Sequence, residues 1–116
     1  MGTIRTPGRG AGEVARRTGT SRSIHRLAAE ELTEAFRFYR REAGLRMAQR
    51  FLDEFEHIAR LVERQPELGT PAGADRRSYP LHDFPYSLIY TTDERGLRVL
   101  VVRHQHRDPT HGEGRR

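Results

Sequence analysis

The residues best suited to proton transfer lie close together near the C-terminal end of the sequence. His104 and His106 alternate along the predicted end of a β-strand, and Arg107 follows them. Histidine titrates near neutral pH, and arginine supplies positive charge beside a phosphate. RNA cleavage without a metal needs a group to deprotonate the 2′-OH, a group to protonate the 5′-oxygen and nearby cations. This pattern permits such a site, with Arg77 as a further cation.

The same residues also have a purely structural interpretation, which we consider the more frequent one. Histidines and arginines at a strand end commonly pack against the following turn, here at Asp108-Pro109. His104, His106 and His111 could be a metal cluster, but no acid or third histidine has a diagnostic ligand spacing. Cysteine is absent, which excludes disulfides and thiolate chemistry. We expect neither a metal nor a cofactor.

Length and charge limit the organisation of the chain. Its 116 residues are enough for one small domain, and all 21 basic residues are arginine, so a lysine base is excluded. The net charge of +5 is located in the ends, since residues 1–22 carry +4, residues 23–104 are neutral and residues 105–116 carry +1. We therefore expect a disordered basic arm at 1–22, a domain at 23–109 and a flexible tail at 110–116. With no apolar run long enough for a membrane span and no export signal, we expect a cytoplasmic protein.

Two stretches have the apolar period of helices. Leu32, Ala35, Phe36 and Tyr39 form one stripe in a helix that starts at about residue 28 and ends before Gly44. A second stripe continues from residue 48 to residue 62, and Pro66 ends that helix. Because the connection at Gly44 is short, the two helices are predicted to fold back as an antiparallel hairpin.

The period then changes to two, which is typical of strands. Residues 66–73 are predicted to be a turn, and residues 86–91 and 97–102 form a β-hairpin around a turn at 93–96. Residues 77–81 are a plausible third strand and residues 23–26 a short first one. The predicted fold class is α+β, with a helix hairpin packed on a small antiparallel sheet in the order β-α-α-β-β-β.

Three short motifs on these elements resemble the RelE/ParE superfamily of bacterial toxins. The first is Pro66-Glu67-Leu68-Gly69 at the end of the second helix, and the second is Phe84-Pro85-Tyr86 at the start of a strand. The third is His104 followed by Arg107-Asp108-Pro109, after the last strand. The resemblance covers about residues 24–109. It implies the toxin of a type II toxin–antitoxin module, with a cognate antitoxin as partner.

Two mechanisms are implied by this resemblance. RelE-like toxins cleave messenger RNA on the ribosome, whereas ParE-like toxins inhibit DNA gyrase by binding. The Arg-Asp-Pro and Phe-Pro-Tyr motifs favour the ParE and plasmid-stabilisation side. The target would then be bound by the end of the last strand: Arg103, His104, His106, Arg107 and Asp108. The alternatives are a ribosome-dependent endoribonuclease that uses His104, His106, Arg77 and Arg107, and an inert interaction module.

The two helices carry more large apolar side chains than a small sheet can cover. Phe38 lies off the main stripe of the first helix, and Leu45, Met47 and Leu61 lie at or beyond the edge of the second. We expect these residues, together with Tyr90 of the sheet, to form a groove for an antitoxin helix or strand. The alternative is that they thicken the core. A homodimer and a toxin–antitoxin hetero-oligomer are both compatible with such a surface.

Overall fold

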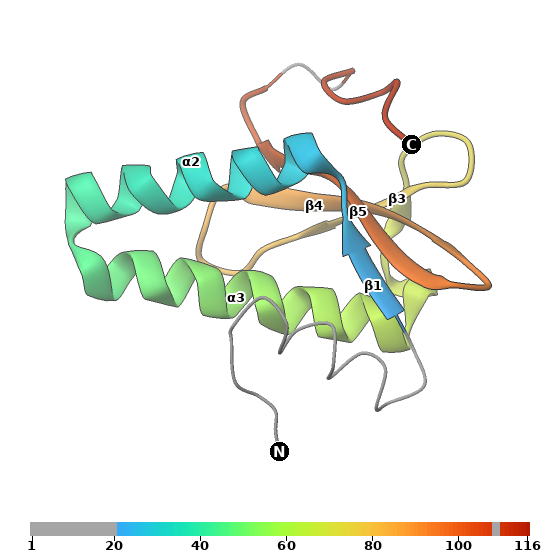
Figure 1. The fold of residues 1–116 in the computed structure, drawn as a ribbon, viewed down its shortest axis with the longest axis horizontal. Helices are drawn as coiled ribbons and strands as arrows, with labels where there is room; N and C mark the ends of the chain where they lie inside the picture. Colours follow the sequence, from blue (N-terminus) through green and yellow to red (C-terminus); the bar gives the residue numbers. More distant parts are fainter. Residues whose placement is uncertain (1–20, 108–109) are drawn as a thin grey trace.

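The computed structural model describes residues 21–107 and 110–116, and two helices pack on one face of its five-stranded sheet (Figure 1). The elements are β1 (Ser21–Ile24), α2 (Arg26–Ala43), α3 (Leu45–Arg64), the 3-10 helix η1 (Pro66–Leu68), β2 (Thr70–Pro71), β3 (Arg77–Pro80), β4 (Tyr86–Asp93) and β5 (Gly96–His104). The predicted α+β class and order of elements are confirmed. Within residues 66–73, the prediction of a simple turn was wrong: η1 continues from α3, and β2 adds a short strand beside β3.

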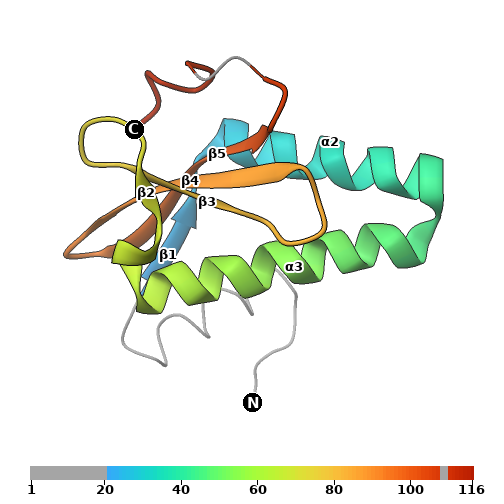
Figure 2. The same ribbon diagram turned by 180° about the vertical axis from the view of Figure 1, so that it is seen from behind.

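The strands lie in the order β1-β5-β4-β3-β2. The pairs from β5 to β2 are antiparallel, as predicted, whereas β1 runs parallel to β5 and covers only its first part, Gly96 to Val99. Beyond Val99 none of the described residues forms a strand along the outer edge of β5, and the start of α2 lies there instead (Figures 1 and 2).

Two residues set the ends of the helices. His25 is the N-cap of α2, where its Nδ1 accepts a hydrogen bond from the Leu27 N–H at 3.1 Å. Gly44 lies between α2 and α3 with φ of 96°, a backbone conformation that favours glycine. This one-residue connection produces the predicted antiparallel helix hairpin.

The main core lies between the helices and one face of the sheet. Phe51, Phe55 and Val62 of α3 pack there against Leu88 and Tyr90 of β4. From β5 the core receives Leu97, Val99 and Val102.

Strict alternation along the strand predicts that Val101 lies on the same face of the sheet as Val99, and that prediction was wrong. The register shifts by one residue, because Ile89 pairs with Val101 while Tyr90 pairs with Val99, which leaves Leu100 as a β-bulge. The bulge turns Leu100 and Val101 to the other face, where they form a second buried cluster with Ile89.

The second cluster is contacted by residues 110–116, which the sequence predicts as a flexible tail. The Cα of Gly112 lies so close to Val101 that a Cβ at that position would be 2.5 Å from its Cγ2. Arg76 donates hydrogen bonds to the backbone carbonyls of Gly112, at 3.2 Å, and Arg115, at 2.5 Å. This segment is therefore held against the sheet rather than extending away from it (Figure 2).

Within residues 21–107 and 110–116, neither helix combines the length and the apolar character that crossing a membrane requires.

Candidate functional site

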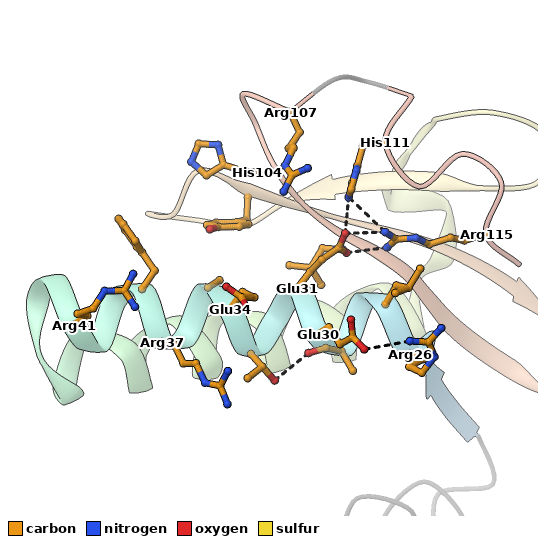
Figure 3. A pocket seen from close by; sticks show the side chains of 17 residues that line it. Arg26, Glu30, Glu31, Glu34, Arg37, Arg41, His104, Arg107, His111 and Arg115 are labelled. Carbon is orange, nitrogen blue, oxygen red and sulfur yellow. Dashed lines mark hydrogen bonds and ion pairs between the residues drawn. The ribbon is translucent and has the colours of Figure 1, made fainter.

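A groove with a volume of about 870 Å³ lies along α2 (Figure 3). Its opposite wall consists of Tyr86, the end of β5 and the side chains of Arg107, His111 and Arg115. The two ends of the groove differ in the contacts that their side chains make. We call residues 26–33 the anchored half of α2 and residues 34–43 its open half.

The anchored half is bound to β5 and to the C-terminal segment through Glu31. Its carboxylate accepts hydrogen bonds from the backbone N–H of Val102 at 3.0 Å and from both terminal nitrogens of Arg115, at 2.8 and 2.9 Å. His111 also contacts this carboxylate, and Arg115 donates to the carbonyl of Leu100 at 3.1 Å. Side chains therefore take the place of a neighbouring strand here: Glu31 accepts from the backbone N–H of Val102, and Arg115 donates to the backbone carbonyl of Leu100 (Figure 3).

The charge on Glu31 is stabilised by these contacts. Burial alone raises the pKa of its carboxyl, but the hydrogen bonds from Arg115, His111 and Val102 outweigh burial, so the pKa is lowered from its ordinary value of 4.5. The side chain of Arg115 is only 12% exposed. Sequence reasoning missed this arrangement, because the two residues are 84 positions apart and no local pattern links them.

The open half of α2 presents free charge and an exposed ring to the groove. Phe38 is 46% exposed, and Arg37 and Arg41 are exposed beside it. Arg41 pairs only with its neighbour Glu42, at 3.8 Å on the surface. No residue that the structure describes forms an ion pair with Arg37 or with Arg107. This half can therefore accept a partner that carries negative charge.

The two predicted histidines do come together at the rim of the groove. The centre of the His104 ring lies 5.2 Å from that of His106 and 5.0 Å from that of Tyr86. His104 Nδ1 accepts a hydrogen bond from the backbone N–H of His106 at 3.1 Å. Burial raises the pKa of Tyr86, although the charge of Arg107 opposes the shift.

Arg77 lies elsewhere, which corrects its predicted place beside the histidines. In the sheet register Arg77 pairs with Tyr90, in the middle of β4, whereas His104 pairs with Tyr86 at the start of β4. Its guanidinium donates to the carbonyls of Gly69 at 2.7 Å and Glu67 at 3.5 Å. Arg77 therefore binds the end of η1 to β3, and it lines a separate hollow.

Of the two remaining predicted target-binding residues, only Arg103 is described by the structure. Arg103 lies on the opposite face from His104, as its strand position predicts, and lines a hollow with His111 and Glu113. Asp108 lies outside the described residues. Within the described part of the chain, no group of three or more His, Asp or Glu side chains could hold a metal ion.

The residues predicted to bind an antitoxin differ in exposure. Phe38 and Leu45 are 46% and 49% exposed, whereas Met47 and Leu61 are half-buried against the main core. Tyr90 is only 1% exposed, so its assignment to a binding surface was wrong. Its hydroxyl donates to the carbonyl of Pro66 at 2.6 Å and accepts from the Gly69 N–H at 3.0 Å, which places the ring in the core.

Comparison with known proteins agrees with this fold. The family model described as the ParE toxin of the type II toxin–antitoxin system parDE matches residues 23–109. The chain belongs to the ParE toxin family. This confirms the resemblance to the RelE/ParE superfamily and its ParE side, and the ParE family implies an antitoxin partner.

Solved structures that share the ParE fold include the following example. It is described as the chromosomal ParDE toxin–antitoxin system from P. aeruginosa. Its TM-score is 0.65 at 16% sequence identity, and the match covers 73% of this chain and 95% of that one. An identity this low shows the fold alone. No curated protein matches this ParE chain significantly in sequence.

Proposed function

We propose that this ParE-family chain is a toxin that inhibits DNA gyrase by binding and is neutralised by a cognate antitoxin. The observation that carries this proposal is the separation of Arg77 from His104 and Arg107. An RNase site needs a base, an acid and cations within reach of one phosphate. Since Arg77 is already bound to two carbonyls, the predicted set is incomplete, and this favours binding over RNA cleavage.

The open half of α2 supports the antitoxin part of the proposal. An antitoxin helix or extended segment would cover the exposed Phe38 ring, and its acidic side chains would pair with Arg37, Arg41 and Arg107. Leu45 extends the apolar surface to the end of the helix hairpin. The result is a toxin–antitoxin hetero-oligomer in the cytoplasm, in a module that serves plasmid stabilisation.

The end of β5 is the proposed contact with gyrase. His106 and Arg107 are exposed there, and His104 is half-buried beside them. An exposed basic and aromatic cluster of this kind suits contact with a large macromolecule.

The test is to induce the full chain in a bacterial host without an antitoxin, and to assay purified protein for inhibition of gyrase supercoiling. We expect filamentation, a DNA-damage response, intact translation and loss of supercoiling. The His104→Ala, His106→Ala double variant should weaken inhibition, whereas a His57→Ala, His82→Ala control changes two exposed histidines elsewhere and should not.

Two outcomes would contradict the proposal. Arrested translation with cut messages that disappear in the His104→Ala, His106→Ala variant would show the endoribonuclease. Normal growth at full expression of folded protein would show an inert interaction module.

A further inference from the structure

The end of the helix hairpin carries an excess of positive charge. Residues 23–104 carry thirteen arginines and thirteen acidic residues, and are neutral as a whole. Residues 35–50, at the end of the helix hairpin, carry five arginines and one glutamate, a net charge of +4. The rest of that range therefore carries −4. Such a distribution orients a molecule in the field of a charged partner, with the hairpin end toward negative charge.

Four of these arginines form what we call the hairpin-end patch. Arg40 and Arg41 lie three and four positions after Arg37 on α2, so each is a surface neighbour of Arg37, and Arg46 lies in the first turn of α3. All four are exposed. The one-residue connection at Gly44 places the two helix ends side by side, beyond the ends of the strands (Figures 1 and 2).

The hairpin-end patch has little negative charge of its own. Its single ion pair among the described residues is the surface contact from Arg41 to Glu42 at 3.8 Å. Arginines elsewhere are paired more closely: Arg115 with Glu31 at 2.8 Å, and Arg26 with Glu30 at 3.2 Å. The hairpin-end patch thus gathers four exposed arginines around a single ion pair at one protruding end of the domain.

We propose that the hairpin-end patch binds the phosphate backbone of duplex DNA without reading its sequence. Guanidinium groups bond phosphate oxygens directly, and each contact releases condensed counterions from DNA. Arg37 and Arg41 also line the groove along α2, so the patch overlaps the surface proposed for the antitoxin, whereas Arg40 and Arg46 lie outside that groove and test the DNA contact separately. The inference does not depend on gyrase being the target.

Duplex DNA fits this surface better than an acidic protein does. A stable protein interface needs an apolar centre that becomes fully buried. The exposed apolar neighbours of the patch are Phe38, which lines the groove along α2, and Leu45, whereas Arg40 and Arg46 outside the groove present charge alone. Backbone phosphates repeat regularly along a duplex, so a protruding set of arginines can bind them without matching a particular shape.

The test measures binding of the full chain to a fluorescent 20-base-pair duplex of arbitrary sequence, by anisotropy, over a range of salt concentrations. We expect the Arg40→Gln, Arg46→Gln variant to bind about tenfold more weakly at about 0.1 M salt. The slope of log affinity against log salt should fall by about 2, one unit for each lost phosphate contact. Glutamine has a helix propensity close to that of arginine, so the fold should be kept.

Two controls separate position from total charge. Arg60→Gln, Arg64→Gln removes the same charge from the other end of α3 and should change the affinity by less than about twofold. The basic arm is a second candidate for DNA binding, so its residues Arg5, Arg9, Arg16 and Arg17 are changed to Gln in a further variant of the full chain. An Arg40→Lys, Arg46→Lys variant keeps the charge and should keep most of the affinity.

The inference is overturned by any of four results. The first two are equal losses of affinity in the α3 control and the patch variant, and loss of binding in the arm variant alone. The third is a full chain that does not bind DNA at 50 mM salt, and the fourth is equal competition by polyglutamate of matched charge, which would show a surface for acidic proteins. Gyrase inhibition is a separate measurement, so failure here leaves the proposed function unaffected.

Discussion

The two halves of α2 differ both in sequence and in surroundings. In the anchored half, Glu31 is bound by Arg115, His111 and the backbone of β5. In the open half, Phe38 and Arg37 lie at the surface without a comparable partner. One helix thus stabilises the fold at its start and presents a binding surface at its end. The difference shows that charge on a helix predicts function only when its partners are known.

The largest loss of stability is expected when the charge of Glu31, in the anchored half, is removed. A Glu31→Gln variant leaves the guanidinium of Arg115 without its counter-charge in a largely buried position. We expect the free energy of unfolding in urea to fall by about 2–3 kcal/mol. Glu34→Gln, an exposed change on the open half, should alter it by less than about 0.5 kcal/mol. Equal effects of the two variants would contradict the division of α2.

The wild type and the Glu31→Gln variant should also differ in how their free energy of unfolding depends on pH. Because the fold lowers the pKa of Glu31 below 4.5, its contribution is complete above about pH 5.5 and is lost as the pH falls through the lowered pKa. The stability difference between the wild type and Glu31→Gln should therefore be constant near neutral pH and shrink below about pH 4.5. A difference that grew in acid would refute this assignment. Urea titrations at fixed pH steps measure it.

A smaller effect on stability is expected from a substitution in residues 110–116 that changes no charge. Gly112 has φ of 82°, and a Cβ there would lie 2.5 Å from Val101 Cγ2. Gly112→Ala should lower the unfolding free energy by about 1–2 kcal/mol. Gly114→Ala is the matched control, because nothing lies within 4 Å of its Cβ position. Hydrogen exchange in β5 should become faster in the first variant alone.

The smallest effect on stability should come from the open half. Phe38→Ala removes a ring that contacts Tyr39 edge to face, with centroids 5.3 Å apart, but is otherwise exposed. We expect the unfolding free energy to fall by less than about 1 kcal/mol. Binding of a cognate antitoxin should weaken much more, by about tenfold, as calorimetry would measure. Full antitoxin affinity in this variant would remove Phe38 from the proposed surface.

Local periodicity predicted the helices and most of the sheet from the sequence. The period of 3.6 residues identified α2 and α3, and alternation around residues 93–96 identified β4 and β5. It did not predict the bulge at Leu100, because a bulge depends on how two strands pair and not on one of them.

The candidate site was predicted less completely, for the same reason. His104 and His106 are neighbours in sequence, and their proximity could be inferred. Arg77 was misplaced because its distance from His104 depends on the register of two strand pairs. The bond between Glu31 and Arg115 joins opposite ends of the domain, so only the folded chain reveals it.

The position of Arg115 makes the fold sensitive to trimming. A truncation after residue 114 would take away the partner of Glu31, the donor to Leu100 and a carbonyl bound by Arg76. Loss of Arg115 would thus undo contacts on both faces of the sheet. An affinity tag for this protein is accordingly better placed before residue 21 than after residue 116.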